Sequence, residues 1–180
     1  FDEHNSGNNK TTKAYRPFVL IFSELLDNRE KARKREKYLK SGVGKELNSE
    51  DELKMLRVIR RLKATVPIMI RATFLGAHAL PIEYKEKRSE YIDLIVDKML
   101  PKVIEENLAD FVDVFCDKGF FTVDETDRIL GAAAALGLRA KIHANELDFS
   151  GGIQVGVKHD ALSVDHLEFT GEEEMEVLLN

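Results

Sequence analysis

Cysteine is nearly absent from this chain, and tryptophan is absent altogether. Among 180 residues there are one cysteine, Cys116, and four prolines. A single cysteine excludes an internal disulfide framework and any metal site of the CxxC type, and it favours a reducing compartment. No apolar run approaches the roughly 20 residues that span a bilayer, and the polar start does not resemble a signal peptide. We therefore expect a cytoplasmic protein without membrane contact.

The charge of the chain is unevenly distributed. The net charge of -5 divides into 11 Lys/Arg against 7 Asp/Glu in residues 1–47, and 16 against 25 in residues 48–180. A nucleic acid would be attracted to the first part and repelled by the second. The length allows one domain with a small appendage. The split therefore indicates two parts with different histories or different partners.

Short apolar strands alternate with helices from residue 67 onward. This alternation is typical of parallel βα units, so the predicted fold class is α/β. About four units would form a partial (β/α)₈, TIM-like barrel, or a small open sheet, preceded by a small strand–helix fragment. The predicted strands are 18–22, 67–74, 111–115, 138–142 and 161–164, and the predicted helices are 28–41, 50–63, 89–106, 122–136, 151–158 and 170–180.

Local signals mark the ends of several helices. A Ser or Thr followed three residues later by Glu is typical of a helix start, and Gly137 is placed to end the helix over 122–136. Pro101 is expected to kink or break the helix over 89–106. The predicted capping pairs are Asp27 with Glu30, Ser49 with Glu52, Thr122 with Glu125, and Thr170 with Glu173.

Three of the four later strands are followed closely by a histidine. His78, His143 and His166 occupy equivalent positions in successive units, and Glu146 follows His143 by three residues. Because the carboxyl ends of parallel strands lie at one rim, where sites are built, we expect these side chains to gather there. Three imidazoles at one rim could bind a metal, shuttle protons or hold a substrate carbonyl, with Glu146 as a neighbouring acid or base.

Other polar groups are more simply explained by structure. His159 is expected at the opposite end of the sheet, and Cys116 is expected to be a small buried residue rather than a nucleophile. The segment 41–45 is too short and wrongly placed for a phosphate-binding loop. Glu36, within a basic helix, is either an ion-pair partner or a metal ligand. The acidic residues 172–174 are typical of a helix N-terminus.

Five segments of the later part of the chain form a recognisable set. They are Lys-Ser-Gly-Val-Gly at 40–44, Asp-Glu-Leu-Lys-Met-Leu-Arg at 51–57, Phe-Leu-Gly-Ala-His-Ala-Leu-Pro at 74–81, Lys-Ile-His-Ala-Asn-Glu at 141–146 and Ser-Val-Asp-His-Leu-Glu at 163–168. With these segments, residues from about 41 to 180 resemble imidazolonepropionase, a metal-dependent family of the amidohydrolase superfamily. The stretch at 74–81 is specific to that family.

The resemblance implies a hydrolase of histidine degradation that opens the ring of imidazolone propionate to give formiminoglutamate. It implies a distorted (β/α)₈ barrel in which a zinc or iron ion activates water. Carried over by motif, His143 is the metal ligand, and Glu146 and His166 are the catalytic residues beside that water. His78 is the residue that contacts the imidazolone ring.

The chain also departs from the family pattern. It contains no His-x-His pair, and Val43 stands where the family has a tyrosine. The metal-binding aspartate and the substrate-contacting arginine of the family come from strands that the resemblance does not include. One imidazole, His143, is too few to hold a hydrolytic metal. We therefore expect this chain to be inactive alone, with an open sheet face that favours self-association.

Three segments of the basic part form a second set. They are His-Asn-Ser-Gly at 4–7, Tyr-Arg-Pro-Phe-Val-Leu-Ile at 15–21 and Arg-Glu-Lys-Tyr-Leu-Lys-Ser-Gly at 35–42. With these segments, residues 1–46 resemble the C-terminal half of a small GIY-YIG nuclease domain. The resemblance implies that Glu36 is a metal ligand and that nucleic acid is a partner only if this part functions. The first half of that family's pattern is not found, so we expect the nuclease chemistry to be incomplete.

The two resemblances meet at residues 40–44, whose Lys-Ser-Gly-Val-Gly fits both patterns. The charge pattern changes in the same region. We therefore divide the chain into a basic part, 1–46, and a half-barrel part, 47–180. Our hypothesis is that the chain joins two gene fragments, either in nature or by an artefact.

Overall fold

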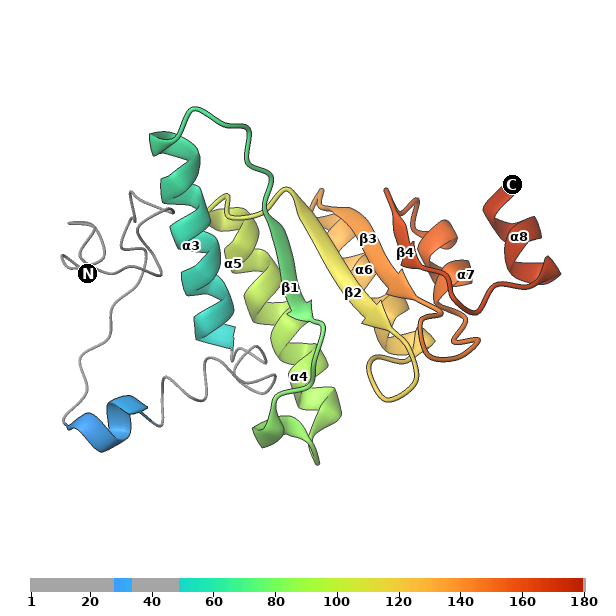
Figure 1. Ribbon diagram of the computed structural model, residues 1–180, viewed down its shortest axis with the longest axis horizontal. Coiled ribbons are helices and arrows are strands. Elements are labelled where there is room, and N and C mark those ends of the chain that lie inside the picture. Colours follow the sequence, from blue (N-terminus) through green and yellow to red (C-terminus); the bar gives the residue numbers. More distant parts are fainter. Residues whose placement is uncertain (1–27, 34–48, 180) are drawn as a thin grey trace, which may run out of the picture. The chain divides into compact units, whose positions relative to one another are not determined.

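The computed structural model describes residues 28–33 and 49–179 (Figure 1). The chain divides into two units, Phe1–Lys37 and Tyr38–Asn180. In the first unit residues 29–33 are helical, and Oδ1 of Asn28 accepts the N–H of Lys31 at 2.9 Å. This helix begins close to the predicted position, and Asn28 caps it, whereas the predicted capping residue, Asp27, lies outside the described residues. The predicted strand over 18–22 and Glu36 lie outside the described residues.

The second unit alternates helices and strands along its whole described length. Its elements are α3 (Ser49–Thr65), β1 (Thr73–Ala77), η3 (Ile82–Tyr84), α4 (Arg88–Leu94), η4 (Ile95–Met99), α5 (Leu100–Glu105), β2 (Phe111–Cys116), α6 (Val123–Ala135), β3 (Arg139–Ala144), α7 (Gly152–Lys158), β4 (Val164–His166) and α8 (Glu172–Leu179).

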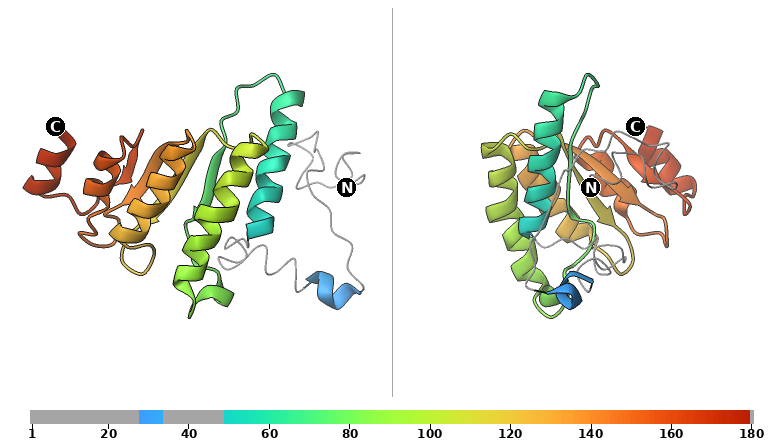
Figure 2. Two further views of the ribbon diagram at one scale, coloured as in Figure 1. Left: turned by 180° about the vertical axis from the view of Figure 1, so that it is seen from behind. Right: turned by 60° about the vertical axis from the view of Figure 1, so that its left-hand side comes forward.

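The four strands form one parallel sheet in the order β1-β2-β3-β4. Each strand is added on the same side of the one before it, so right-handed crossovers place the intervening helices on one face. Figures 1 and 2 show α4, α5, α6 and α7 on that face. A doubly wound sheet would instead reverse its strand order. The predicted α/β class is confirmed, and the arrangement is that of a partial TIM-like barrel.

The hydrophobic core lies between the sheet and these helices. Alternate residues of each strand point to the helices, so the strands contribute a continuous apolar surface. The buried residues that meet there include Val112, Val114 and Cys116 of β2, Ala140, Ile142 and Ala144 of β3, and Ile129, Leu130 and Ala133 of α6. The residues between them in β2 and β3 point to the opposite face, where the candidate site is found.

The strand boundaries differ from the prediction at both edges of the sheet. The strand predicted over 67–74 is observed as Thr73–Ala77, because pairing with β2 begins at Thr73, and Ile68 and Met69 are exposed. The strand predicted over 138–142 is observed as Arg139–Ala144, and the strand predicted over 161–164 is observed as Val164–His166, which shares only Val164 with the prediction. Backbone pairing depends on the neighbouring strand and not on side-chain polarity, so the polar strand ends were missed.

The helix expected to kink or break at Pro101 is not broken there, although its regular α-helical pattern is interrupted just before the proline. The helix continues from α4 through η4, a π-helical turn, into α5, with right-handed helical backbone at each junction. Pro101 occupies the first turn of α5. The N–H of Leu100 bonds to the carbonyl of Ile95, five residues earlier, so the missing N–H of Pro101 falls where the α-helical hydrogen-bond pattern is already interrupted.

The helix caps agree only in part with the sequence. Thr122 and Glu125 form the predicted capping box, and Gly137 has a positive φ of 84° after α6. At α8 the cap lies one residue later than predicted, because Gly171 donates its N–H to Glu174. The carboxylate of Glu52 accepts the N–H of Leu75 at 2.8 Å and so joins α3 to β1, while the side chain of Ser49 lies outside the described part.

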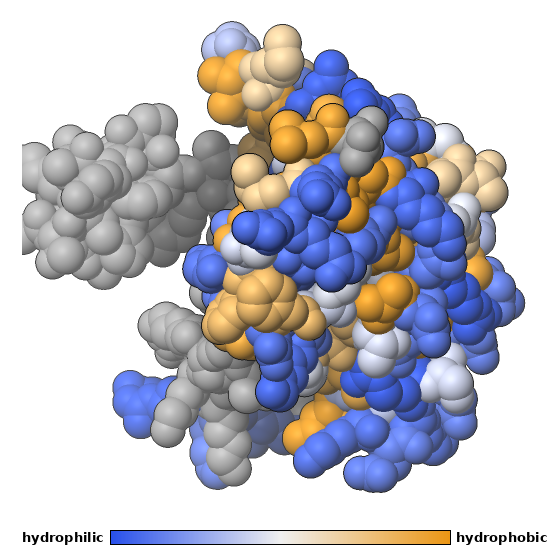
Figure 3. All heavy atoms as spheres, turned by 90° about the vertical axis from the view of Figure 1, so that its right-hand side faces the viewer, coloured by the Kyte–Doolittle hydropathy of each residue, from blue (hydrophilic) through white to orange (hydrophobic). Residues whose placement is uncertain are grey.

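The surface near α8 mixes hydrophobic and hydrophilic side chains (Figure 3). Met175, Leu178 and Leu179 of α8 are exposed hydrophobic residues beside its acidic first turn. Among the described residues, no helix is both long enough and apolar enough to cross a membrane.

Candidate active site

Three histidines from three strand ends lie together. The ring centroid of His143, in β3, is 4.7 Å from that of His78, which follows β1, and 5.1 Å from that of His166, at the end of β4. The structure therefore brings together the three imidazoles that the sequence places at one rim. Each is about one-quarter to one-third exposed, so each is open to a small molecule.

A buried carboxylate, Asp113 of β2, lies between two of these imidazoles. Its Oδ1 is 3.0 Å from Nδ1 of His143 and 3.4 Å from Nε2 of His78. Burial raises the pKa of Asp113, but the hydrogen bonds and charges of His78 and His143 outweigh it and hold this pKa below its usual range. Asp113 is therefore an ionised carboxylate that orients two rings.

The register of the sheet explains why these groups share a face. Phe115 of β2 pairs with His143 of β3, and Asp113 lies two residues before Phe115 on the same side. The ring centroid of Phe115 lies 6.1 Å from that of His78, 5.9 Å from that of His143 and 6.3 Å from that of His166. Phe115 is thus an apolar neighbour common to all three imidazoles.

His166 reaches the cluster through an unusual backbone conformation. It pairs in register with Ala144, which is fully buried on the helical side, so a regular strand would send its side chain there. Its φ is instead +83°, a left-handed value that costs a residue with a Cβ about 1–2 kcal/mol. This turn brings Nε2 of His166 to 3.4 Å from Oε2 of Glu146 and Nδ1 to 3.5 Å from Oε1 of Glu168.

The loop that carries Glu146 is fixed by a second buried carboxylate. Oδ2 of Asp117, just after β2, accepts the N–H of Glu146 at 2.7 Å and that of Leu147 at 3.0 Å. The neighbouring Asn145 is buried at φ +56°, and its side chain donates to the carbonyl of Phe169. These bonds hold Glu146 at the rim beside His166.

The other sequence candidates lie apart from the cluster. His159, at the end of α7, pairs through Nε2 with Asp127 of α6 at 2.7 Å. Cys116 is buried, as predicted, and burial raises the pKa of its thiol. Glu36 cannot be placed, because it lies outside the described residues.

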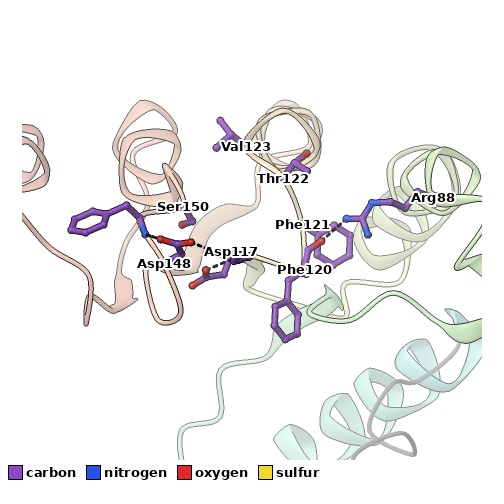
Figure 4. Close-up of a pocket in the computed structure, with 11 residues that line it drawn as sticks. Arg88, Asp117, Phe120, Phe121, Thr122, Val123, Asp148 and Ser150 are labelled. Atoms are coloured by element: carbon purple, nitrogen blue, oxygen red, sulfur yellow. Dashed lines mark hydrogen bonds and ion pairs between the residues drawn. The ribbon is translucent and has the colours of Figure 1, made fainter.

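A hollow of about 490 Å³ lies beside the cluster but contains none of its three histidines (Figure 4). Its charged groups are satisfied locally: Lys118 pairs with Asp148 at 2.9 Å, and Arg88 pairs with both carboxylate oxygens of Glu125. We therefore place the chemistry at the histidine cluster. The hollow is lined by Arg88, residues 117–123 and residues 148–150.

Sequence reasoning missed Asp113, Asp117 and Phe115. Asp113 did leave a signal, because it is the one charged residue in the strand Phe-Val-Asp-Val-Phe-Cys. A charge within a strand expected to be covered on both faces indicates either a partner or a site. Phe115 left no such signal, because an aromatic residue is ordinary in a strand.

Curated relatives match most of the chain. It is 55% identical over 140 residues to the imidazolonepropionase of Flavobacterium johnsoniae and 50% identical over 140 residues to that of Christiangramia forsetii. It is 47% identical over 137 residues to that of Alkaliphilus metalliredigens. The first two matches cover 78% of this chain and 34% of each relative, and the third covers 76% and 32%.

Most of this chain resembles imidazolonepropionase. It spans about a third of the length of the curated relatives that it matches. Residues 1–49 match a different family, described as the GIY-YIG catalytic domain. Both resemblances found in the sequence are therefore confirmed.

The donor groups at the cluster fit the metal that the first resemblance implies. Nε2 of His78, a carboxylate oxygen of Asp113 and a ring nitrogen of His143 all lie within 4.8 Å of one another. Nε2 of His78 is buried and faces Oδ1 of Asp113 at 3.4 Å. Imidazole and carboxylate donors together are typical ligands of zinc and ferrous iron.

Proposed function

We propose that residues 47–180 carry part of the site of a ring-opening hydrolase of the imidazolonepropionase type. The observation that carries this proposal is the gathering of His78, His143, His166 and Glu146 at one end of a parallel sheet. The sequence similarity to imidazolonepropionases supports the substrate class, a five-membered cyclic amide. Imidazolone propionate is then the small-molecule partner, in a cytoplasmic pathway of histidine breakdown.

Hydrolysis of a cyclic amide needs a water to lose a proton and the ring nitrogen to gain one. Glu146 and His166 form a pair suited to both transfers, because Oε2 and Nε2 are 3.4 Å apart and both side chains are partly exposed. His166, oriented through Nδ1 by Glu168, would hold the water against the carbonyl, and Glu146 would accept the proton that this water loses as its oxygen bonds to the carbonyl carbon. Glu146 would then give the same proton to the ring nitrogen as the C–N bond of the ring breaks. His78 would contact the imidazolone ring, and Phe115 would exclude water beside it.

His143 would hold the zinc or iron ion that the family uses. When bound, such an ion polarises a carbonyl and lowers the pKa of a water. Asp113 fixes the ring of His143 through the 3.0 Å contact with Nδ1, as carboxylates commonly do for metal-ligating histidines. We propose that this chain alone is inactive, because it contains no His-x-His pair.

A binding experiment tests the proposal without requiring turnover. Imidazolone propionate added to the full-length chain, with and without Zn²⁺, should shift the imidazole NMR signals of His78, His143 and His166. The signals of His159 should not move, since His159 is held by Asp127 outside the cluster. Saturable shifts confined to His159, or no shifts at all, would refute the proposal. Turnover comparable to that of a full-length relative would refute the claim of inactivity.

The N-terminal part has a second candidate function, favoured by its match to the GIY-YIG catalytic domain. We propose that residues 1–46 bind nucleic acid electrostatically and that Glu36 is a metal ligand. DNA affinity of the full chain should then fall steeply with salt. Glu36→Gln should abolish metal-dependent cleavage, if any occurs, without weakening DNA binding. Absence of binding at low salt would remove this candidate.

We propose further that the two parts meet near residues 40–44 as a fusion of two gene fragments. The support is that residues 1–49 match the GIY-YIG catalytic domain, whereas 78% of the chain matches imidazolonepropionases. Sequencing reads across codons 38–48 of source DNA decide the matter. Reads that never span the junction would show an artefact, and a complete GIY-YIG frame upstream would support a natural fusion.

Light scattering of the purified chain tests the expected self-association.

A further inference from the structure

We infer that Glu52 and Tyr91 are positioning residues for His78, because they hold the irregular end of β1 that turns His78 toward the other histidines. Glu52 belongs to α3 and Tyr91 to α4, so neither is part of the histidine cluster itself. The placement of His78 follows from the backbone and does not depend on any reaction. Its use, which is contact with the substrate ring, rests on the proposed function.

β1 contains one residue more than the matching stretch of β2. Phe74 pairs with Val112 and Ala77 pairs with Val114, so three steps along β1 correspond to two steps along β2. Such a β-bulge moves every later side chain of the strand to the other face of the sheet. Accordingly, Phe74 and Ala77 both belong to the buried core although they are three residues apart.

The bulge decides toward which face His78 points. In a regularly alternating strand His78 would share the face of Phe74, four residues before it, and would point to the helices. Because Ala77 is buried in the core, His78 instead lies on the opposite face, where its ring centroid is 4.7 Å from that of His143. The extra residue in β1 therefore brings the first imidazole of the cluster to the other two.

Two side chains from the helices bind the backbone of this bulge. The carboxylate of Glu52 accepts the N–H of Leu75 at 2.8 Å. The hydroxyl of Tyr91 donates to the carbonyl of Gly76 at 2.7 Å. The carbonyl of Leu75 in turn accepts the N–H of His78 at 3.2 Å, which closes a turn within the irregular segment. Glu52 and Tyr91 thus fix the peptide groups that lead directly into His78.

The burial of these groups makes the bulge a specified feature. Glu52 is 7% exposed and Tyr91 is 1% exposed, and a buried polar group that loses its hydrogen bond is costly. Burial raises the pKa of the Tyr91 hydroxyl, so this group stays a donor at neutral pH. A Cβ at Gly76 would collide with the ring of Phe74, so the bulge also requires a glycine here.

NMR of the full-length chain tests the placement without substrate. A nuclear Overhauser effect should link the ring protons of His78 and His143 in the wild-type chain. Tyr91→Phe and Glu52→Ala should each lose this effect. Glu52→Ala should also speed the exchange of the Leu75 amide by about 10–100-fold. Glu52→Gln should keep both properties of the wild type, because an amide oxygen can still accept the N–H.

The matched control is Tyr84→Phe. The ring of Tyr84 packs against that of Tyr91, with centroids 5.1 Å apart, so this substitution removes a neighbouring hydroxyl but leaves the bond to Gly76 in place. Tyr84→Phe should therefore keep the contact between His78 and His143. The contact between His143 and His166 should persist in all the variants.

Three outcomes would overturn the inference. The His78–His143 effect kept in both Tyr91→Phe and Glu52→Ala would show that the bulge needs neither side chain. Its loss in Glu52→Gln would refute the role of Glu52 as an acceptor. Loss of the contact between His143 and His166 in the same variants would show general loosening and no particular role for His78. If Glu52→Ala does not fold, Tyr91→Phe still decides.

A titration with imidazolone propionate separates this inference from the hydrolase proposal. The affinity should fall by about 10-fold in Tyr91→Phe and stay unchanged in Tyr84→Phe. If the wild-type chain does not bind this compound, the hydrolase proposal fails, whereas the His78–His143 effect still decides the placement. If Tyr91→Phe displaces His78 without weakening binding, the placement is supported and the contact of His78 with the substrate ring is refuted.

Discussion

One carboxylate oxygen of Asp113 lies 3.0 Å from Nδ1 of His143 and 3.4 Å from Nε2 of His78. The three residues come from three neighbouring strand regions, so their alignment depends on the register of the sheet. A one-residue shift of β2 against β3 would turn Asp113 into the apolar core. The site and the fold are therefore coupled through this contact.

Asp113→Asn should change how stability depends on pH. The pKa of Asp113 is lowered in the folded chain, because the two histidines outweigh the effect of burial. The carboxylate of Asp113 thus stabilises the folded chain at pH values above its pKa in the unfolded state. This stabilisation is lost as the pH falls through its pKa in the folded state. We expect a loss of about 1–3 kcal/mol at pH 7, which shrinks as pH falls below about 4. Urea unfolding from pH 3 to 7 measures this, and parallel curves for the two proteins would contradict it.

Asp110→Asn should also lower the stability of the chain in a way that depends on pH. Burial would raise the pKa of Asp110, but Lys63, the N–H of Ala72 and Arg71 lower it to about 2. After solvent screening we expect a cost of about 1 kcal/mol at pH 7. The cost should disappear as pH falls from about 4 to 2, because the carboxylate is lost in both states.

The control for this experiment is Asp93→Asn. Asp93 pairs with Arg128 at 2.7 Å, but both side chains are about half exposed. Its substitution should change stability by less than about 0.5 kcal/mol. If urea unfolding shows the same loss of stability for Asp110→Asn and Asp93→Asn, the burial and the several partners of Asp110 do not make it more stabilising than Asp93.

Asp117→Ala should loosen the loop that carries Glu146. Oδ2 of Asp117 accepts the N–H groups of Glu146 and Leu147. Loss of two charged hydrogen bonds should raise the exchange of these amides by about 10–100-fold. Amide hydrogen exchange by NMR measures this, with Asp148→Ala as a control in the same region. Exchange unchanged at both amides would mean that other contacts hold the loop.

Gly152→Ala should destabilise the chain. A Cβ at Gly152 would lie 2.6 Å from Cβ of Ala144 and 3.0 Å from the carbonyl oxygen of Cys116, where little can move. We expect a loss of about 1–3 kcal/mol, the usual cost of overpacking.

The matched control is Gly131→Ala in α6. Its Cβ would meet only the ring of His159, at an ordinary 3.6 Å. This substitution should stabilise the chain by about 0.5–1 kcal/mol, because alanine favours a helix over glycine. Thermal unfolding of both variants makes the comparison, and a shift of the same sign in both would contradict it.

The sequence predicts the repeated units well because their signals are local. The capping box of Thr122 and Glu125 and the apolar strands depend on residues that are neighbours in the chain. The gathering of His78, His143 and His166 also follows, since parallel strands place their carboxyl ends together. Each of these features follows from the spacing of residues along the chain and from the order of the helices and strands.

Other features depend on contacts between distant residues and could not be predicted in this way. The start of β1 is set by pairing with Phe111, and the positive φ of His166 is set by the cluster that it joins. The π turn before Pro101 has no signal of its own in the sequence, although the proline itself is visible there. The role of Asp113 becomes clear only when the register brings its two partners beside it.

The order β1-β2-β3-β4 has a consequence for what can be joined to this sheet. Within residues 49–179, β1 and β4 each have one long side without a neighbouring strand. Backbone N–H and C=O groups on such sides are ready to accept another extended segment. The sheet can therefore be widened from either end by main-chain bonds alone, while His143 and Asp113, which belong to its two inner strands, keep their positions.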